Sequence, residues 1–134
     1  MSLPRSFDKY IPHIQSFVKF YVGRNAQENF DIIDIGKTHN LGHNTGLGHN
    51  TSLWFHVANH PSNHVVAVFP LDTKFLDKRH LHYVVKQGAV LCKAHSAKVC
   101  QDKNVEIIWT FIDNVEKTDI LGTVSTKNTK SVII

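Results

Sequence analysis

Three histidines spaced by four residues, His56, His60 and His64, are the residues of this sequence whose type and spacing could do chemistry. Histidine ligates metal ions and exchanges protons near neutral pH. On one helix this spacing would place three imidazoles on a single face. However, Pro61 interrupts the segment, its flanks alternate like strands, and it contains no cysteine or acidic residue. The sequence therefore predicts no metal site and no cofactor here.

A catalytic role would require a partner for one of these histidines. The chain has no G-x-S-x-G element, no cysteine–histidine signature and no phosphate-binding loop of the G-x-x-x-x-G-K type. We therefore expect a protein that is not an enzyme. A histidine- or metal-dependent enzyme acting on nucleic acid is kept as an alternative.

Nucleic-acid binding fits the residue types better. Trp54 and His56 share one face of an expected strand, where they would offer a stacking platform. Along an expected helix, Arg79, Lys86 and Lys93 recur every seven residues and form a basic stripe. Because stacking combined with positive charge is a common way to hold nucleic acid, we predict that the basic stripe contacts phosphates.

The elements that must position these residues are read from hydrophobic periodicity. Asn25, three residues before Glu28, is a candidate N-cap for a short helix. Strands are expected at residues 16–22, 53–57, 64–69 and 104–112, with a short one ending at residue 134, and a long helix at residues 73–96. We predict an α+β fold with a mostly antiparallel sheet of about five strands, packed against one long helix and one or two short helices.

Two segments lack this periodicity. Residues 1–15 contain Pro4 and Pro12 and are expected to form a loose N-terminal segment. Residues 36–52 contain the near-duplication GHNTGL and GHNTSL, and are predicted to be a loop insertion rich in glycine, histidine and asparagine. The length of 134 residues fits a single domain over residues 1–134.

Charge and composition indicate the cellular location that is expected for this protein. The net charge of +4 is concentrated, because residues 74–103 hold seven bases against two acids. No apolar run is long enough to span a membrane, and the N-terminus has no apolar segment typical of a signal peptide. Cys92 and Cys100 do not suggest a disulfide framework. An intracellular, cytoplasmic protein is therefore expected.

Four segments resemble the NFACT-R domain over residues 17–134. The most specific is LWFHVANHPSNHVV, which is similar to the family's W-F-H-V element followed by P-G-S-H-V. VGRNAQEN is similar to G-[KR]-[ND]-x-x-x-N, and GAVLCKAHS and NVEIIWTFIDNVEK are similar to a small-residue helix and a following strand. The matching residues are Gly23, Arg24, Asn25, Asn29, Trp54, Phe55, His56, Val57, Pro61, His64 and Val65.

The resemblance implies a module that binds RNA. Large members of the family act in ribosome-associated quality control with peptidyl-tRNA, and small stand-alone members carry a coiled-coil tail. One eukaryotic group of the small members is linked to DNA sensing. A small stand-alone member binding transfer or ribosomal RNA, with the ribosome as a further partner, is expected here. The expected nucleic-acid-binding residues are Arg24, Asn25, Trp54, His56, His64, Arg79, Lys86 and Lys93.

The chain departs from the family pattern at several positions. Ser52 stands where the family has aspartate, and the family's P-G-S-H element reads Pro61-Ser62-Asn63-His64, without the glycine. These departures concern the preferred ligand more than the fold. DNA is therefore kept as an alternative ligand, and a protein partner docking on residues 42–51 as a rival function.

Overall fold

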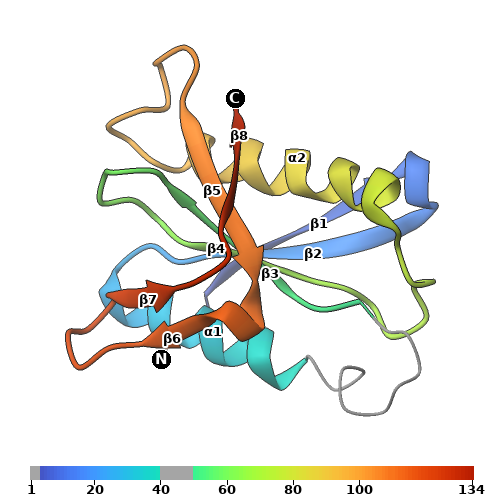
Figure 1. Ribbon diagram of the computed structural model, residues 1–134, viewed down its shortest axis with the longest axis horizontal. Helices are drawn as coiled ribbons and strands as arrows, with labels where there is room; N and C mark the ends of the chain where they lie inside the picture. The colour runs from blue at the N-terminus through green and yellow to red at the C-terminus, as the bar shows by residue number, and fades with distance from the viewer. Residues whose placement is uncertain (1–3, 40–49) are drawn as a thin grey trace.

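A six-stranded antiparallel sheet between two helices forms the centre of the computed structural model, which describes residues 4–39 and 50–134 (Figure 1). The strand order is β1-β2-β4-β3-β5-β8, and a separate antiparallel pair joins β6 and β7. The elements are β1 (Arg5–Ile11), β2 (Ser16–Val22), α1 (Ala26–Thr38), β3 (Leu53–Val57), β4 (Val65–Val68), α2 (Lys78–Ala94), β5 (Glu106–Phe111), β6 (Val115–Lys117), β7 (Val124–Thr126) and β8 (Lys130–Ile133).

The α+β class and the mostly antiparallel sheet are confirmed, but the helix content differs from the prediction. α1 has 13 residues and α2 has 17, so the described residues contain two α-helices of comparable length in place of one long helix. Two short 3-10 helices of the described residues lie at Pro12–Ile14 and Ile112–Asn114. None of these helices is long and apolar enough to cross a bilayer.

The N-terminal segment is not loose where the structure describes it. β1 lies between Pro4 and Pro12 and pairs with β2 along its whole length, from Arg5 opposite Val22 to Ile11 opposite Ser16. The expectation for residues 1–15 is therefore wrong for residues 5–11. The two prolines flank the strand and leave its ladder intact, because neither occupies a hydrogen-bonded position within it.

α1 begins as its sequence predicts and ends later. The side-chain oxygen of Asn25 accepts a hydrogen bond of 2.9 Å from the Glu28 backbone N–H, which confirms the predicted N-cap. The helix continues to Thr38, so the prediction that a loop begins at residue 36 is wrong. Gly36 lies inside the helix, where a Cβ would come 2.8 Å from the Val66 side chain. The first GHNT copy and the start of the second fall outside the described residues, whereas Asn50 and Thr51 of the second copy are described.

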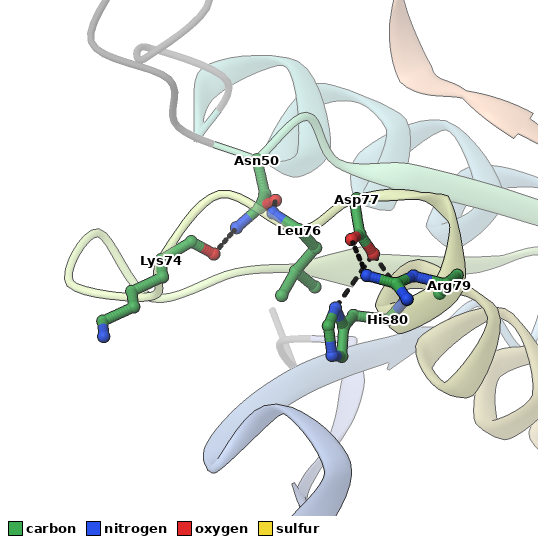
Figure 2. A network of polar contacts seen from close by, with 6 residues as sticks. All are labelled: Asn50, Lys74, Leu76, Asp77, Arg79 and His80. Atoms are coloured by element: carbon green, nitrogen blue, oxygen red, sulfur yellow. Dashed lines mark hydrogen bonds and ion pairs between the residues drawn. The ribbon is translucent and has the colours of Figure 1, made fainter.

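α2 packs on one face of the sheet and starts at a well-bonded turn. Asp77 caps the helix, because its Oδ1 accepts the His80 backbone N–H at 3.0 Å. Just before it, the Asn50 side chain donates to the Lys74 carbonyl at 2.9 Å and accepts the Leu76 N–H at 2.8 Å (Figure 2). The helix therefore runs over residues 78–94 and not 73–96, and residues 73–77 form its approach. Its predicted apolar side is buried, at Val84, Val85, Gly88, Ala89, Leu91 and Cys92.

The sheet carries a hydrophobic core on each face. One lies beneath α2 and includes Phe55 and Trp109, and the other lies beneath α1 and the β6–β7 pair and includes Trp54 (Figure 1). Side chains alternate along β3, so Phe55 points toward α2 and Trp54 toward α1. Both faces of this central strand are therefore covered.

Candidate nucleic-acid interface

A cleft of about 660 Å³ opens on the face of the sheet that carries α1, and we call it the α1-face cleft. Trp54, His56 and His64 form its floor. Ile108 of β5, which pairs with His56, also lines the cleft. The N-terminus of α1, the β3–β4 turn and the β6–β7 hairpin form its walls, with Asn25, Ala26, Asn29, His60, Pro61, Ser62, Asn63, Leu121, Gly122, Thr123, Val124 and Thr126. Five of the eight predicted site residues therefore lie at or beside this cleft.

The floor is a set of three aromatic rings. Trp54 donates a hydrogen bond of 3.1 Å from Nε1 to Nδ1 of His64. The His56 ring lies parallel to Trp54, with centroids 5.7 Å apart, and edge-on to His64 at 4.9 Å. Trp54 is only 2% exposed, so the prediction that it offers an exposed stacking platform is wrong. Of the three rings, His56 is the partly exposed one.

The two motif segments are joined by the backbone of His64. Its N–H donates to Oδ1 of Asn29 at 3.2 Å, and its carbonyl accepts the Gly23 N–H at 3.0 Å. A Cβ at Gly23 would collide with the Asn29 side chain, which explains why glycine occupies this position. Residues about 40 positions apart in the sequence are thus fixed against each other at the cleft.

Burial keeps the floor histidines uncharged. It lowers the pKa of His64 to about 3, with the neighbouring His56 as a smaller cause, and it also lowers the pKa of His56. Because Nδ1 of His64 accepts the Trp54 hydrogen bond, the neutral ring carries its proton on Nε2. At neutral pH the floor therefore presents hydrogen-bonding groups without charge.

Arg24 and Asn25 organise the start of α1 beside the cleft. The Arg24 side chain donates to the Glu28 carboxylate at 2.9 and 2.6 Å, and the Arg24 backbone N–H donates to it at 2.9 Å. These bonds lower the pKa of Glu28 to about 2, chiefly through the side-chain hydrogen bond. Asn25 is engaged as the helix cap, while 43% of the Arg24 side chain is exposed.

The basic stripe lies on the opposite face of the sheet, on α2. Arg79 is 87% exposed and pairs with Asp77 at 3.3 Å (Figure 2). Lys93 is partly buried and donates from Nζ to the Ile134 carbonyl at 3.0 Å. Lys86 is exposed and has no ion pair within the described part of the chain. The structure therefore separates the basic stripe from the α1-face cleft and does not bring the predicted residues into one site.

Several lining residues were not predicted to form the site. Ser62 and Asn63 lie in the turn of the most specific motif but depart from its pattern, and Thr123 and Thr126 come from the β6–β7 hairpin, which sequence periodicity did not reveal. No group of three potential metal ligands exists among the described residues.

A family model, the NFACT protein RNA binding domain, matches residues 10–128. The chain belongs to this family. The two segments that resemble family motifs, around Gly23 and His64, meet at the α1-face cleft. No curated protein matches the chain.

Among solved structures, the C-terminal part of the fibronectin/fibrinogen-binding protein from Streptococcus suis is similar, with a TM-score of 0.70 and 18% sequence identity. The likeness covers all of this chain and 45% of that one, so this NFACT-family chain spans less than half of the solved relative. At this identity the likeness shows a shared fold alone.

Proposed function

We propose that this chain is a non-catalytic module that binds structured RNA, transfer or ribosomal, in connection with translation and ribosome-associated quality control. One observation carries the proposal. The two motif segments of an RNA-binding family, around Gly23 and His64, converge on a single cleft. Residues that are spread along the sequence and gathered at one concave surface are typical of a binding site.

The α1-face cleft, and not the basic stripe, is the proposed contact surface. Arg24 supplies an exposed guanidinium beside this cleft. Like Arg79, which pairs with Asp77 on α2, Arg24 has an acidic partner, Glu28, so its place beside the α1-face cleft, and not its freedom, distinguishes it. Because the sheet separates the two surfaces, Lys86 would influence RNA at the cleft only through its long-range field.

The lining chemistry supports binding without catalysis. The described lining residues include no carboxylate and no cysteine. The floor histidines have lowered pKa values, which suits hydrogen bonding better than proton transfer at neutral pH.

Salt titration of RNA binding tests this function. We expect the association constant for a folded, transfer-RNA-sized RNA to fall steeply with salt, to exceed that for duplex DNA of matched length, and to be unchanged by a chelator. A preference for DNA would favour the DNA-binding alternative, and a requirement for metal would favour the enzyme alternative. Absence of binding at low salt would contradict the proposal.

A pair of variants locates the contact. Arg24→Gln combined with Glu28→Gln removes the guanidinium without changing net charge, and the amide oxygen introduced at position 28 can still accept the backbone N–H of residue 24. We expect this double variant to weaken RNA binding and to reduce the slope of log K against log salt by about one. Lys86→Gln, which removes one positive charge on α2, should leave that slope nearly unchanged. The reverse pattern would place the RNA on α2.

A further inference from the structure

The α1-face cleft is electrically neutral although the chain is basic. Its described lining residues include no lysine, arginine, aspartate or glutamate, whereas the whole chain has a net charge of +4. A phosphate inside the cleft would lose its hydration without meeting a cation, which costs several kcal/mol. The charged parts of a ligand should therefore stay at the rim, near Arg24.

The lining instead combines apolar surface with uncharged polar groups. Ile108 and Leu121 contribute the apolar surface, and Ser62, Asn63 and Thr123 the polar groups. On the floor, Nε2 of the neutral His64 ring carries a proton, and the His56 ring is partly exposed. A flat, uncharged ring with polar edges matches such a lining, since one side can pack while the edges form hydrogen bonds.

We propose that the α1-face cleft takes a single unstacked base of the bound RNA, while the adjoining phosphates remain at its rim. The inference rests on the proposed function, which supplies RNA as the source of the base. A volume of about 660 Å³ accommodates one nucleotide but not a duplex. Since paired bases are stacked, the base should come from a loop, bulge or end.

The first experiment separates base from phosphate. Trp109→Phe leaves Trp54 as the reporter at the cleft, because Trp109 lies in the core on the other face of the sheet. This protein is titrated with adenosine or uridine 5′-monophosphate and, as the matched control, with ribose 5-phosphate. We expect the nucleotides to change Trp54 emission and ribose 5-phosphate to have no effect. An equal response to ribose 5-phosphate would overturn the inference.

A filled cleft provides the second test. Thr126 lines the cleft, so Thr126→Phe should obstruct it and weaken nucleotide binding at least tenfold. Ser125→Phe is the matched control, because the neighbouring residue of β7 projects to the other side of the strand. Both positions are exposed, so both variants should fold. Equal nucleotide binding by the two variants would overturn the inference.

Binding of an RNA that lacks one base tests the inference together with the proposed function. A hairpin with an abasic nucleotide in its loop should bind at least tenfold more weakly than the intact hairpin. If RNA binds but base removal has no effect at any loop position, the inference fails while the proposed RNA binding stands. If nucleotides bind and RNA does not, the proposed function fails while the cleft is still shown to take a base.

Discussion

At the residue scale, the bond between Trp54 and His64 holds the floor of the α1-face cleft. Both side chains are buried, so each polar atom of the pair depends on the other for its hydrogen bond. The Trp54 ring, which was expected to stack on a ligand, instead holds the buried His64 ring in position. A residue type that suits nucleic-acid stacking is used here to build the site.

This bond predicts a measurable coupling. His64→Leu leaves the Trp54 N–H without an acceptor and should lower the free energy of unfolding by about 1–3 kcal/mol. Adding Trp54→Phe removes the stranded N–H, so the double variant should be more stable than the sum of the single effects implies. Urea unfolding followed by circular dichroism gives the four free energies. Strict additivity would show that the bond contributes nothing.

Burial of His64 also predicts a dependence of stability on pH. The folded pKa of about 3 lies below the unfolded value near 6.5, so between these values the unfolded chain binds a proton that the folded chain does not. The free energy of unfolding should therefore fall as the pH falls from 6.5 toward 3. Between pH 6.5 and 4.5 the His64 contribution should approach ~1.4 kcal/mol per pH unit.

His64→Gln isolates this contribution, since the amide oxygen can still accept the Trp54 N–H while the side chain no longer titrates. Over the same window, its free energy of unfolding should depend less steeply on pH. The difference in slope should correspond to at most one proton taken up on unfolding, or ~1.4 kcal/mol per pH unit. Below pH 4.5, protonation of Glu28 adds a loss of the same sign, because the folded pKa of Glu28 is about 2. Identical pH profiles for the two proteins would contradict the account.

At the element scale, the fit of α2 against the sheet depends on Gly88. A Cβ at this position would overlap the ring of Phe55 on β3. Although alanine favours a helix over glycine by about 1 kcal/mol, we expect Gly88→Ala to destabilise the protein by about 1–3 kcal/mol through overpacking. Thermal unfolding measures the change. Val90→Ala, on the exposed side of the same helix, should change stability by less than about 0.5 kcal/mol.

Rescue distinguishes this contact from a general effect of the substitution. The double variant Gly88→Ala with Phe55→Leu should lose less stability than the sum of the losses in the two single variants. A stabilised Gly88→Ala protein would show that α2 does not rest on Phe55 as closely as the structure indicates.

Much of each element could be predicted from the sequence where a local rule acts alone. The N-cap at Asn25 and the buried side of α2 with Gly88 follow from capping chemistry and from periodicity. The position of Trp54 could not be predicted in this way. Alternation shows that the side chains of Trp54 and Phe55 point to opposite faces of the sheet. Only the tertiary placement of α1 and β6–β7 shows that the face with Trp54 is also buried.

The failures at β1 and α1 have a similar cause. Pro4 and Pro12 suggested disorder, yet pairing with β2 stabilises the strand between them. Gly36 suggested a loop, yet close packing of the helix against Val66 favours glycine at this point. In each case a tertiary contact outweighs the local preference of one residue.

At the scale of the whole molecule, the sheet divides the predicted binding residues into two surfaces. The α1-face cleft combines the motif residues with uncharged polar groups, and α2 carries the basic stripe. Linear sequence could not reveal this separation, because strand order decides which face each helix covers. The meeting of the two motif segments at the α1-face cleft is the reason for proposing this cleft as the contact surface.

Histidine ring signals in NMR test this central claim most directly, because imidazoles lie on both surfaces. His56 and His60 line the α1-face cleft, whereas His80 and His82 are exposed on α2. On addition of a folded RNA, we predict that the ring signals of His56 and His60 shift or broaden first and those of His80 and His82 change little. Early changes confined to His80 and His82 would contradict the account and place the RNA on the opposite face.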